Sequence, residues 1–327
     1  MVTQMVLMKG ITPAVVSDID LELAVHAFKY AGVKDADIVR TNEVAEADKA
    51  MDEGKYVATT NSNLISQCRP VEVAIDATGV PDVGAKVATD AINNKKHVVM
   101  LNVETDVVIG PLLDKMAKDN GVIYTGSAGD EPGAVMELYD FATAMGLEVK
   151  VMGKGKNNRI DKNCNPDTVL EEATRRKMSP KMLCAFKDGT KTMVEMTAMS
   201  NATGLVPDVI GGHGIASDVK SLNETYKLKE DGGILKQHGV VEYVNGIAPG
   251  VFVTVATDNE EIAYQMQYHS MGPGPLWTLY RPYHLCNLET PLTAAKVVID
   301  GEPTIVPKNG LVSECITVCL LYTSDAA

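Results

Sequence analysis

The sequence predicts an α/β protein whose first half forms a doubly wound parallel sheet, and three observations support this prediction. Short apolar runs alternate with amphipathic segments of helical length as far as about residue 150. Runs such as 97–101 (HVVML) are almost continuously apolar, which is typical of strands buried on both faces. Polar residues follow several of these runs directly. Strands separated by helices of about 10–15 residues form parallel sheets through right-handed crossovers.

Each element of the first half follows from its local pattern. Segment 1–9 is amphipathic and is followed by Gly10, which predicts a short helix that ends there. The same periodicity predicts further helices at 21–30, 82–94 and 107–120. The apolar runs predict strands at 12–18, 35–39, 56–59, 71–76, 97–101 and 122–125.

The second half has a different pattern and predicts an α+β domain. An apolar strand is expected at 148–153, and a long helix with a Met and Ala face is expected from Ser179 to Thr203. Two runs, 238–243 and 250–257, are interpreted as a β pair in a mixed or antiparallel sheet. A strand at 276–280 and an apolar helix at 288–299 complete the pattern.

Composition limits the class of protein. The 327 residues correspond to two domains and part of a third, and the net charge of −13 argues against a nucleic-acid partner. No apolar run reaches the roughly 18 residues that span a membrane, and the first residues lack the features of a signal peptide. Scattered cysteines without a CxxC pair indicate reduced thiols and a cytoplasmic location.

The two ends of the chain suggest a fragment. Dinucleotide-binding folds open with a strand and a G-x-G-x-x-G turn, whereas the first strand here is followed by Asp18-Ile19-Asp20. We therefore expect that the chain begins after that strand and turn, and that the fragment is inactive without them. Residues 319–327 resemble the translation of a sequencing adapter, and the run 312–318 resembles a strand without its sheet.

Candidate binding residues lie where the predicted parallel strands end. Asp18 occupies the position of the acid that binds an adenosine ribose, although an Asp there also suits a turn or a helix cap. Thr78, Gly79, Asn102 and Glu104 follow the next strands. Asp130 and Glu131 are interpreted as caps of the helix that starts at Pro132, with a divalent cation as the alternative.

The second half contributes charged candidates. Lys154, Lys156, Asn157, Asn158 and Arg159 follow a strand and suit an anionic or polyhydroxylated ligand, or form a solvated basic loop. In the predicted long helix, Lys191 is a candidate general acid held by Asp188 or Glu195, and a surface ion pair is the alternative.

Four stretches together resemble a known family: 97–106, 129–134, 153–158 and 280–291. They are similar to the homoserine dehydrogenase-like oxidoreductases with a C-terminal SAF domain, in particular the deoxyxylulose phosphate reductoisomerase-like (DRL) group. The resemblance implies a Rossmann-type NAD(P)-binding domain at 1–147 with a returning helix at 287–301, a catalytic and dimerisation domain at 148–286, and the start of a SAF domain at 302–318.

The resemblance also implies a reaction and roles for the candidates. NADPH or NADH would reduce a small hydroxylated or phosphorylated carbonyl compound, since Val103 and Glu104 follow Asn102 where homoserine dehydrogenases place a Lys. In this hypothesis Asn102 and Glu104 face the nicotinamide and substrate, and Lys191 donates the proton. Lys154, Lys156, Asn157, Asn158 and Glu131 would contact the substrate, and the protein would be a homodimer or higher homo-oligomer. The alternatives are a non-catalytic nicotinamide-nucleotide-binding protein and a sugar-phosphate isomerase without net redox chemistry.

Overall fold

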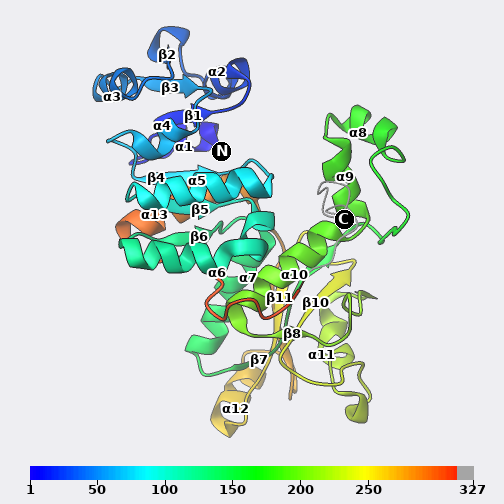
Figure 1. Ribbon diagram of the computed structural model, residues 1–327. Coiled ribbons are helices and arrows are strands. Elements are labelled where there is room, and N and C mark those ends of the chain that lie inside the picture. The colour runs from blue at the N-terminus through cyan, green and yellow to red at the C-terminus, as the bar shows by residue number, and fades with distance from the viewer. Residues whose placement is uncertain (315–327) are drawn as a thin grey trace. The chain divides into compact units, whose positions relative to one another are not determined.

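The computed structural model describes residues 1–314 (Figure 1). The chain forms two compact units. The first contains residues 1–130 and 285–306, and the second contains residues 131–284 and 307–314.

The first unit contains two three-stranded parallel sheets, which confirms the predicted α/β class. One has the order β1-β3-β2 and the other the order β4-β5-β6, with all pairs parallel. The strands are β1 (Val15–Ser17), β2 (Ile38–Arg40), β3 (Tyr56–Thr59), β4 (Val73–Asp76), β5 (His97–Met100) and β6 (Tyr124–Gly126). The segment 35–39 that was predicted as a strand is a 3-10 turn, Asp35–Asp37, that leads into β2.

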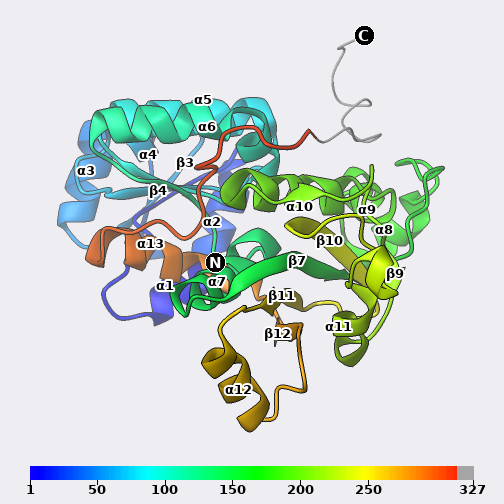
Figure 2. The same cartoon turned by 90° about the horizontal axis from the view of Figure 1, so that it is seen from below.

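Helices pack against these sheets. Figure 2 shows α5 and α6 on one face of β4-β5-β6 and α13 on the other. Helix α6 begins at Val103, earlier than predicted, because the Asn102 side chain caps it by accepting the Thr105 N–H. The helices of this unit are α1 (Val2–Leu7), α2 (Leu21–Tyr30), α3 (Val44–Asp52), α4 (Asn63–Gln67), α5 (Pro81–Asn93), α6 (Val103–Asn120) and α13 (Thr290–Ile299).

The second unit contains a six-stranded mixed sheet. Its order is β12-β11-β7-β10-β8, and β9 also pairs with β10. The expected direct pairing of the runs 238–243 and 250–257 is wrong, because β7 lies between β10 and β11, parallel to the first and antiparallel to the second. The strands are β7 (Glu148–Lys156), β8 (Val206–Pro207), β9 (Ile215–Ala216), β10 (Val240–Asn245), β11 (Val251–Ala256) and β12 (Trp277–Arg281).

The long helix predicted from 179 to 203 is interrupted. Helix α9 (Pro180–Lys187) ends at Asp188, and α10 (Thr190–Thr203) begins two residues later. Gly189 between them has a φ of +92°, which a helix does not allow, and the Asp188 carboxylate accepts the Thr190 N–H at the new start. The other helices of this unit are α7 (Glu131–Ala144), α8 (Leu170–Arg176), α11 (Leu222–Thr225) and α12 (Glu260–Tyr268).

The boundary between the units lies earlier than the sequence suggests. Helix α7 packs against β7, β11 and β12, so it belongs to the second unit and the division falls after Asp130. Ile305 pairs with Gly126 in the first unit, whereas Asn309 and Val312 bond to Asn201 in the second. Residues 312–314 are not in a strand, and the remainder of the expected strand and the 319–327 segment lie outside the described residues.

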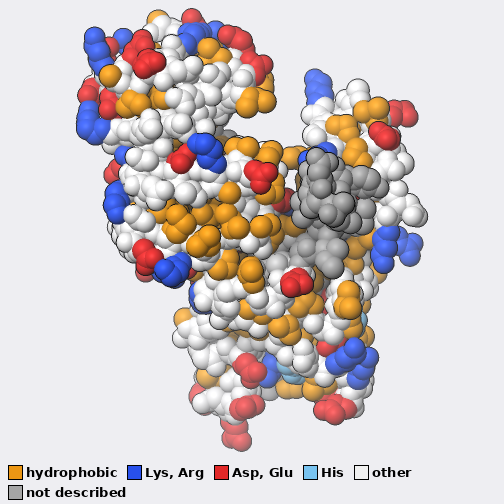
Figure 3. Space-filling view, in the orientation of Figure 1, with side chains coloured by type: hydrophobic (Ala, Val, Ile, Leu, Met, Phe, Trp, Pro, Cys, Tyr) orange, Lys and Arg blue, Asp and Glu red, His pale blue; other side chains and the backbone are white. Residues whose placement is uncertain are grey.

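The surface of the described residues carries charges of both signs. Figure 3 shows acidic and basic side chains interspersed on the face in view. Within residues 1–314, no helix is long and apolar enough to cross a membrane. Of the described cysteines, Cys68 and Cys164 are free, buried thiols.

Candidate functional site

Strand β7 carries two buried lysines on one face of the mixed sheet. Lys154 and Lys156 are 5% and 6% exposed, and their spacing of two residues directs both side chains to the same face. In the parallel neighbour β10, Tyr243 pairs with Lys154 and Asn245 pairs with Lys156. The polar end of β7 therefore lies beside the polar end of β10.

The two glycines that flank Lys154 allow close packing on the opposite face. A Cβ atom on Gly153 would lie 2.2 Å from the Glu242 carbonyl oxygen, and one on Gly155 would lie 2.3 Å from the Ala248 nitrogen. Backbone atoms cannot move away as a flexible side chain can, so only glycine fits. The sequence Lys-Gly-Lys thus places two cations on one face of a strand whose other face touches backbone.

Lys154 is enclosed by carboxylates. Its Nζ lies 2.6 Å from Oε1 of Glu131 at the start of α7, and it also bonds to Glu195 of α10. Burial alone would lower the pKa of Lys154, but Glu195 and Glu131 outweigh this effect and raise it above its ordinary value. Lys154 of β7 therefore connects the start of α7 with α10 through its two carboxylate partners.

Lys191 shares the Glu195 carboxylate. Its Nζ lies 3.7 Å from Oε1 of Glu195, and the Lys191 side chain is 21% exposed. Asp188, the other expected partner, accepts the Thr190 N–H at 2.8 Å and lies 3.8 Å from the Cys184 thiol. The structure therefore brings Lys154, Glu131, Glu195 and Lys191 together, and it assigns Asp188 to the turn between α9 and α10.

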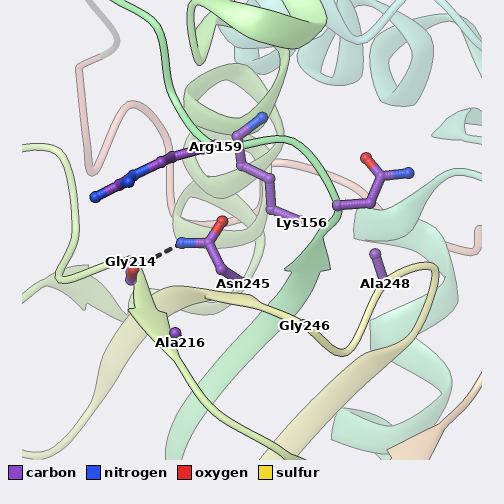
Figure 4. Close-up of a pocket in the computed structure, with 8 residues that line it drawn as sticks. Lys156, Arg159, Gly214, Ala216, Asn245, Gly246 and Ala248 are labelled. Carbon is purple, nitrogen blue, oxygen red and sulfur yellow. Dashed lines mark hydrogen bonds between the residues drawn. The ribbon is translucent and has the colours of Figure 1, made fainter.

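A cavity of about 600 Å³ opens where β7, β9 and β10 end (Figure 4). It contains two cationic side chains and two amides, and of the described residues that line it none is acidic. Lys156, on the cavity wall, donates to the Phe186 carbonyl at 2.7 Å, and burial and the nearby Lys154 lower its pKa. The polar lining comes from Lys156, Asn157, Arg159 and Asn245.

A glycine-rich loop forms one wall of the cavity. Gly214 lines it, and the His213 N–H donates to the buried Glu242 carboxylate at 3.0 Å. The His213 ring nitrogen Nε2 lies 2.7 Å from Oδ2 of Asp208. Gly214 has a φ of +56°, and a Cβ there would lie 2.1 Å from the Tyr243 hydroxyl. The loop therefore has a fixed path over Tyr243.

The candidates of the first unit lie at the ends of its strands. Asp18 follows β1, is half-buried, and accepts the Asp20 N–H at 3.0 Å. Thr78 and Gly79 are exposed after β4, and Gly79 has a φ of +65°. Glu104 is half-buried in the first turn of α6. These residues lie at the strand ends where ligands of parallel α/β sheets bind, whereas the sequence contains no G-x-G-x-x-G loop.

The Asn102 side chain forms hydrogen bonds to the segment that follows β4, at the same end of the sheet. Its side-chain nitrogen donates to Oδ2 of Asp76 and to the Val80 carbonyl, each at 3.0 Å, and Asn102 is 1% exposed. Asn102 therefore holds the turn that contains Thr78 and Gly79.

Glu131 does not fit the alternative role of a metal ligand. Its Oε1 accepts a hydrogen bond from the Lys154 Nζ at 2.6 Å and lies 3.3 Å from Nε2 of the His284 ring. A divalent cation would have to displace the Lys154 ammonium, so we derive no step through a metal. Asp130 is the last residue of the first unit and is buried.

Sequence reasoning missed three residues of the cavity region. Asn245 follows the apolar run of β10 in the same manner as Asn102 follows β5, so the same strand-end rule would have found it. Asp208 and Glu242 gave no local signal, because their role depends on the fold around His213. Asn158 was a candidate and lies outside the cavity lining.

A parallel-sheet unit with polar strand ends and a mixed-sheet unit with a cationic cavity define a two-unit α/β protein. Residues 129–290 match the family model described as "Oxidoreductase DRL, catalytic domain", so this part of the chain is similar to the catalytic domain of those oxidoreductases. The DRL part of the resemblance found in the sequence is therefore confirmed.

Comparison with solved structures gives distant likenesses. A "probable dehydrogenase" from Thermotoga maritima is 13% identical, with 94% of this chain and 88% of that chain covered and a TM-score of 0.47. An oxidoreductase from Bacillus cereus is 11% identical, with 88% of this chain and 89% of that chain covered and a TM-score of 0.38. An NAD-binding protein from Listeria innocua is 17% identical, with 45% of this chain and 43% of that chain covered and a TM-score of 0.25. A comparison with curated proteins finds no match.

Proposed function

We propose that the protein is an NAD(P)H-dependent oxidoreductase whose second unit binds a small hydroxylated or phosphorylated carbonyl or alcohol compound. The observation that supports this proposal most strongly is the cavity at the ends of β7 and β10, lined by Lys156, Arg159 and two amides. Guanidinium and ammonium groups bind phosphate or carboxylate through charge-assisted hydrogen bonds. A cavity of about 600 Å³ is within the usual size range of small-molecule sites.

The first unit would hold the nicotinamide nucleotide. The Asp18 carboxylate would accept hydrogen bonds from ribose hydroxyls. The exposed turn at Thr78 and Gly79 is held in position by Asn102, which donates to the Val80 carbonyl. When bound, the nicotinamide supplies the hydride. The sequence contains no glycine loop, and in place of complete inactivity we propose weak binding of NADH or NADPH and slow turnover.

Lys191 is the proposed proton donor. Lys154 is bonded to two carboxylates that raise its pKa, so it releases a proton poorly at neutral pH. The Lys191 Nζ lies 3.7 Å from Oε1 of Glu195, and its side chain is more exposed than that of Lys154. Glu195 would orient Lys191 toward the carbonyl oxygen of the substrate, where a proton is needed as the alcohol forms.

The assay follows nicotinamide absorbance over a panel of sugar-phosphate, hydroxy-aldehyde and hydroxy-ketone substrates, with nicotinamide fluorescence as the binding readout. We expect slow, substrate-dependent consumption that Lys191→Ala abolishes and Lys191→Arg reduces. Lys229→Ala, at an exposed turn, is the control that keeps activity. Nicotinamide binding without consumption for any substrate would instead indicate a non-catalytic binding protein.

The proposed oligomeric state and cellular location follow from the sequence resemblance and the cysteines. We propose a homodimer or a higher homo-oligomer, as the resemblance to dimerising catalytic domains implies, and a cytoplasmic location, as the scattered cysteines of the sequence indicate. Light scattering coupled to size exclusion measures the mass in solution, and a monomer at all concentrations would contradict the proposal.

A further inference from the structure

We propose that Asn245 determines specificity by accepting a hydrogen bond from a hydroxyl group of the ligand in the cavity. The inference rests on the proposed function and narrows its substrate class to a small anion that also carries a hydroxyl group. It follows from the orientation of one amide, which the surrounding backbone fixes.

The Asn245 side chain has one possible orientation. Its Nδ2 donates to the Gly214 carbonyl at 2.7 Å, and a carbonyl oxygen only accepts hydrogen bonds. The –NH₂ group must therefore face Gly214, and Oδ1 must face away from it. Figure 4 shows this oxygen on the side of Lys156 and Arg159. The cavity thus has a fixed hydrogen-bond acceptor beside two cationic donors.

The loop that carries Gly214 is held at several points. The His213 N–H donates to Glu242 at 3.0 Å, and the His213 ring lies 2.7 Å from Asp208. Asp208 also accepts the Lys236 N–H at 3.1 Å. These bonds fix the Gly214 carbonyl, so a rotation of the Asn245 amide would leave that carbonyl facing another acceptor.

The strand register sets the distance between the two kinds of group. Lys156 and Asn245 are paired residues of neighbouring parallel strands, which lie about 4.8 Å apart. A phosphate at Lys156 and Arg159 would place a hydroxyl two or three bonds further along the ligand near Oδ1 of Asn245. A ligand without that hydroxyl would leave the oxygen without its donor, and sites of this kind discriminate strongly against such analogues.

The test compares two phosphate esters of similar size by isothermal titration of the full chain. Glycerol 3-phosphate carries two hydroxyls, and propyl phosphate carries none. We expect the wild-type chain to bind glycerol 3-phosphate about tenfold more tightly, as one hydrogen bond of about 1.4 kcal/mol gives. Asn245→Leu should bind both esters with the affinity that the wild type has for propyl phosphate.

Two further variants make the result specific. Asn163→Leu changes an exposed asparagine of the same unit and should keep the tenfold preference. Lys156→Ala should lower the affinity for both esters by the same factor. Asn245→Ala serves if the leucine variant does not fold by circular dichroism, and its expected loss of preference is the same.

Each outcome is decisive. Equal affinity of the two esters for the wild type, or a preference that survives in Asn245→Leu and Asn245→Ala, would overturn the role of Asn245 and leave the anion site standing. Failure of both esters to bind the wild type would overturn the proposed function as well.

Discussion

Lys156 of β7 and Asn245 of β10 are paired residues at the ends of neighbouring parallel strands, and both line the cationic cavity of the second unit. One side chain supplies a positive charge and the other a fixed acceptor. This pair connects the sheet topology with the proposed chemistry, because ligands of α/β sheets bind at the carboxyl ends of parallel strands.

The Lys154 cluster should be a principal source of stability in the second unit. Lys154→Met would leave Glu131 and Glu195 buried without their shared cation, which costs about 3–5 kcal/mol of the free energy of unfolding. Lys150→Met on the same strand removes only a partly exposed pair with Glu148 and should cost less than about 1 kcal/mol. Urea unfolding measures both variants, and equal losses would contradict the role given to Lys154.

Asp208 should stabilise the His213 loop in a pH-dependent manner. Burial tends to raise its pKa, but the bonds from His213 and from the Lys236 backbone outweigh burial and lower it below 3.8. A lowered carboxyl pKa contributes stability above the ordinary value, which is lost as the pH falls through the folded value. Asp208→Asn should therefore be less stable than the wild type near neutral pH, and the gap should close in acid. A gap independent of pH would argue against this role of the Asp208 carboxylate.

The Asp106 carboxyl of the first unit should have the opposite effect on the pH dependence of stability. Its burial raises the pKa to about 6, while the Tyr124 hydroxyl donates to it at 2.8 Å. Ionisation of this carboxyl as the pH rises from its ordinary value through about 6 therefore costs stability. Asp106→Asn should stabilise the chain above that pH by on the order of 1–3 kcal/mol, seen as a higher Tm. An unchanged or lower Tm at neutral pH would contradict the assigned shift.

Gly214 should be required for the cavity wall. Gly214→Ala adds a Cβ that would lie 2.1 Å from the Tyr243 hydroxyl at a φ of +56°, so the loop must move and release the Asn245 amide. We expect the preference for glycerol 3-phosphate over propyl phosphate to fall toward that of Asn245→Leu. Gly211→Ala has a similar φ of +79° with open space around it, so it should lose some stability and keep the preference.

The sequence predicted the parallel sheets of the first unit, because buried strands and amphipathic helices are local signals. It also predicted the cationic segment after β7, where Lys156, Asn157 and Arg159 line the cavity. The break at Gly189 and the insertion of β7 between β10 and β11 were missed, because a left-handed glycine and a strand order depend on tertiary packing. The pairing of Lys154 with Glu131 and Glu195 was missed for the same reason, since these residues are far apart along the chain.

A crystal structure of the chain with glycerol 3-phosphate would test the central claim most directly. The phosphate should lie within about 2.7–3.2 Å of the Lys156 ammonium and the Arg159 guanidinium, with a hydroxyl at the same range from Oδ1 of Asn245. Ligand density at a different place, with this cavity filled only by solvent, would contradict the assignment of the substrate site.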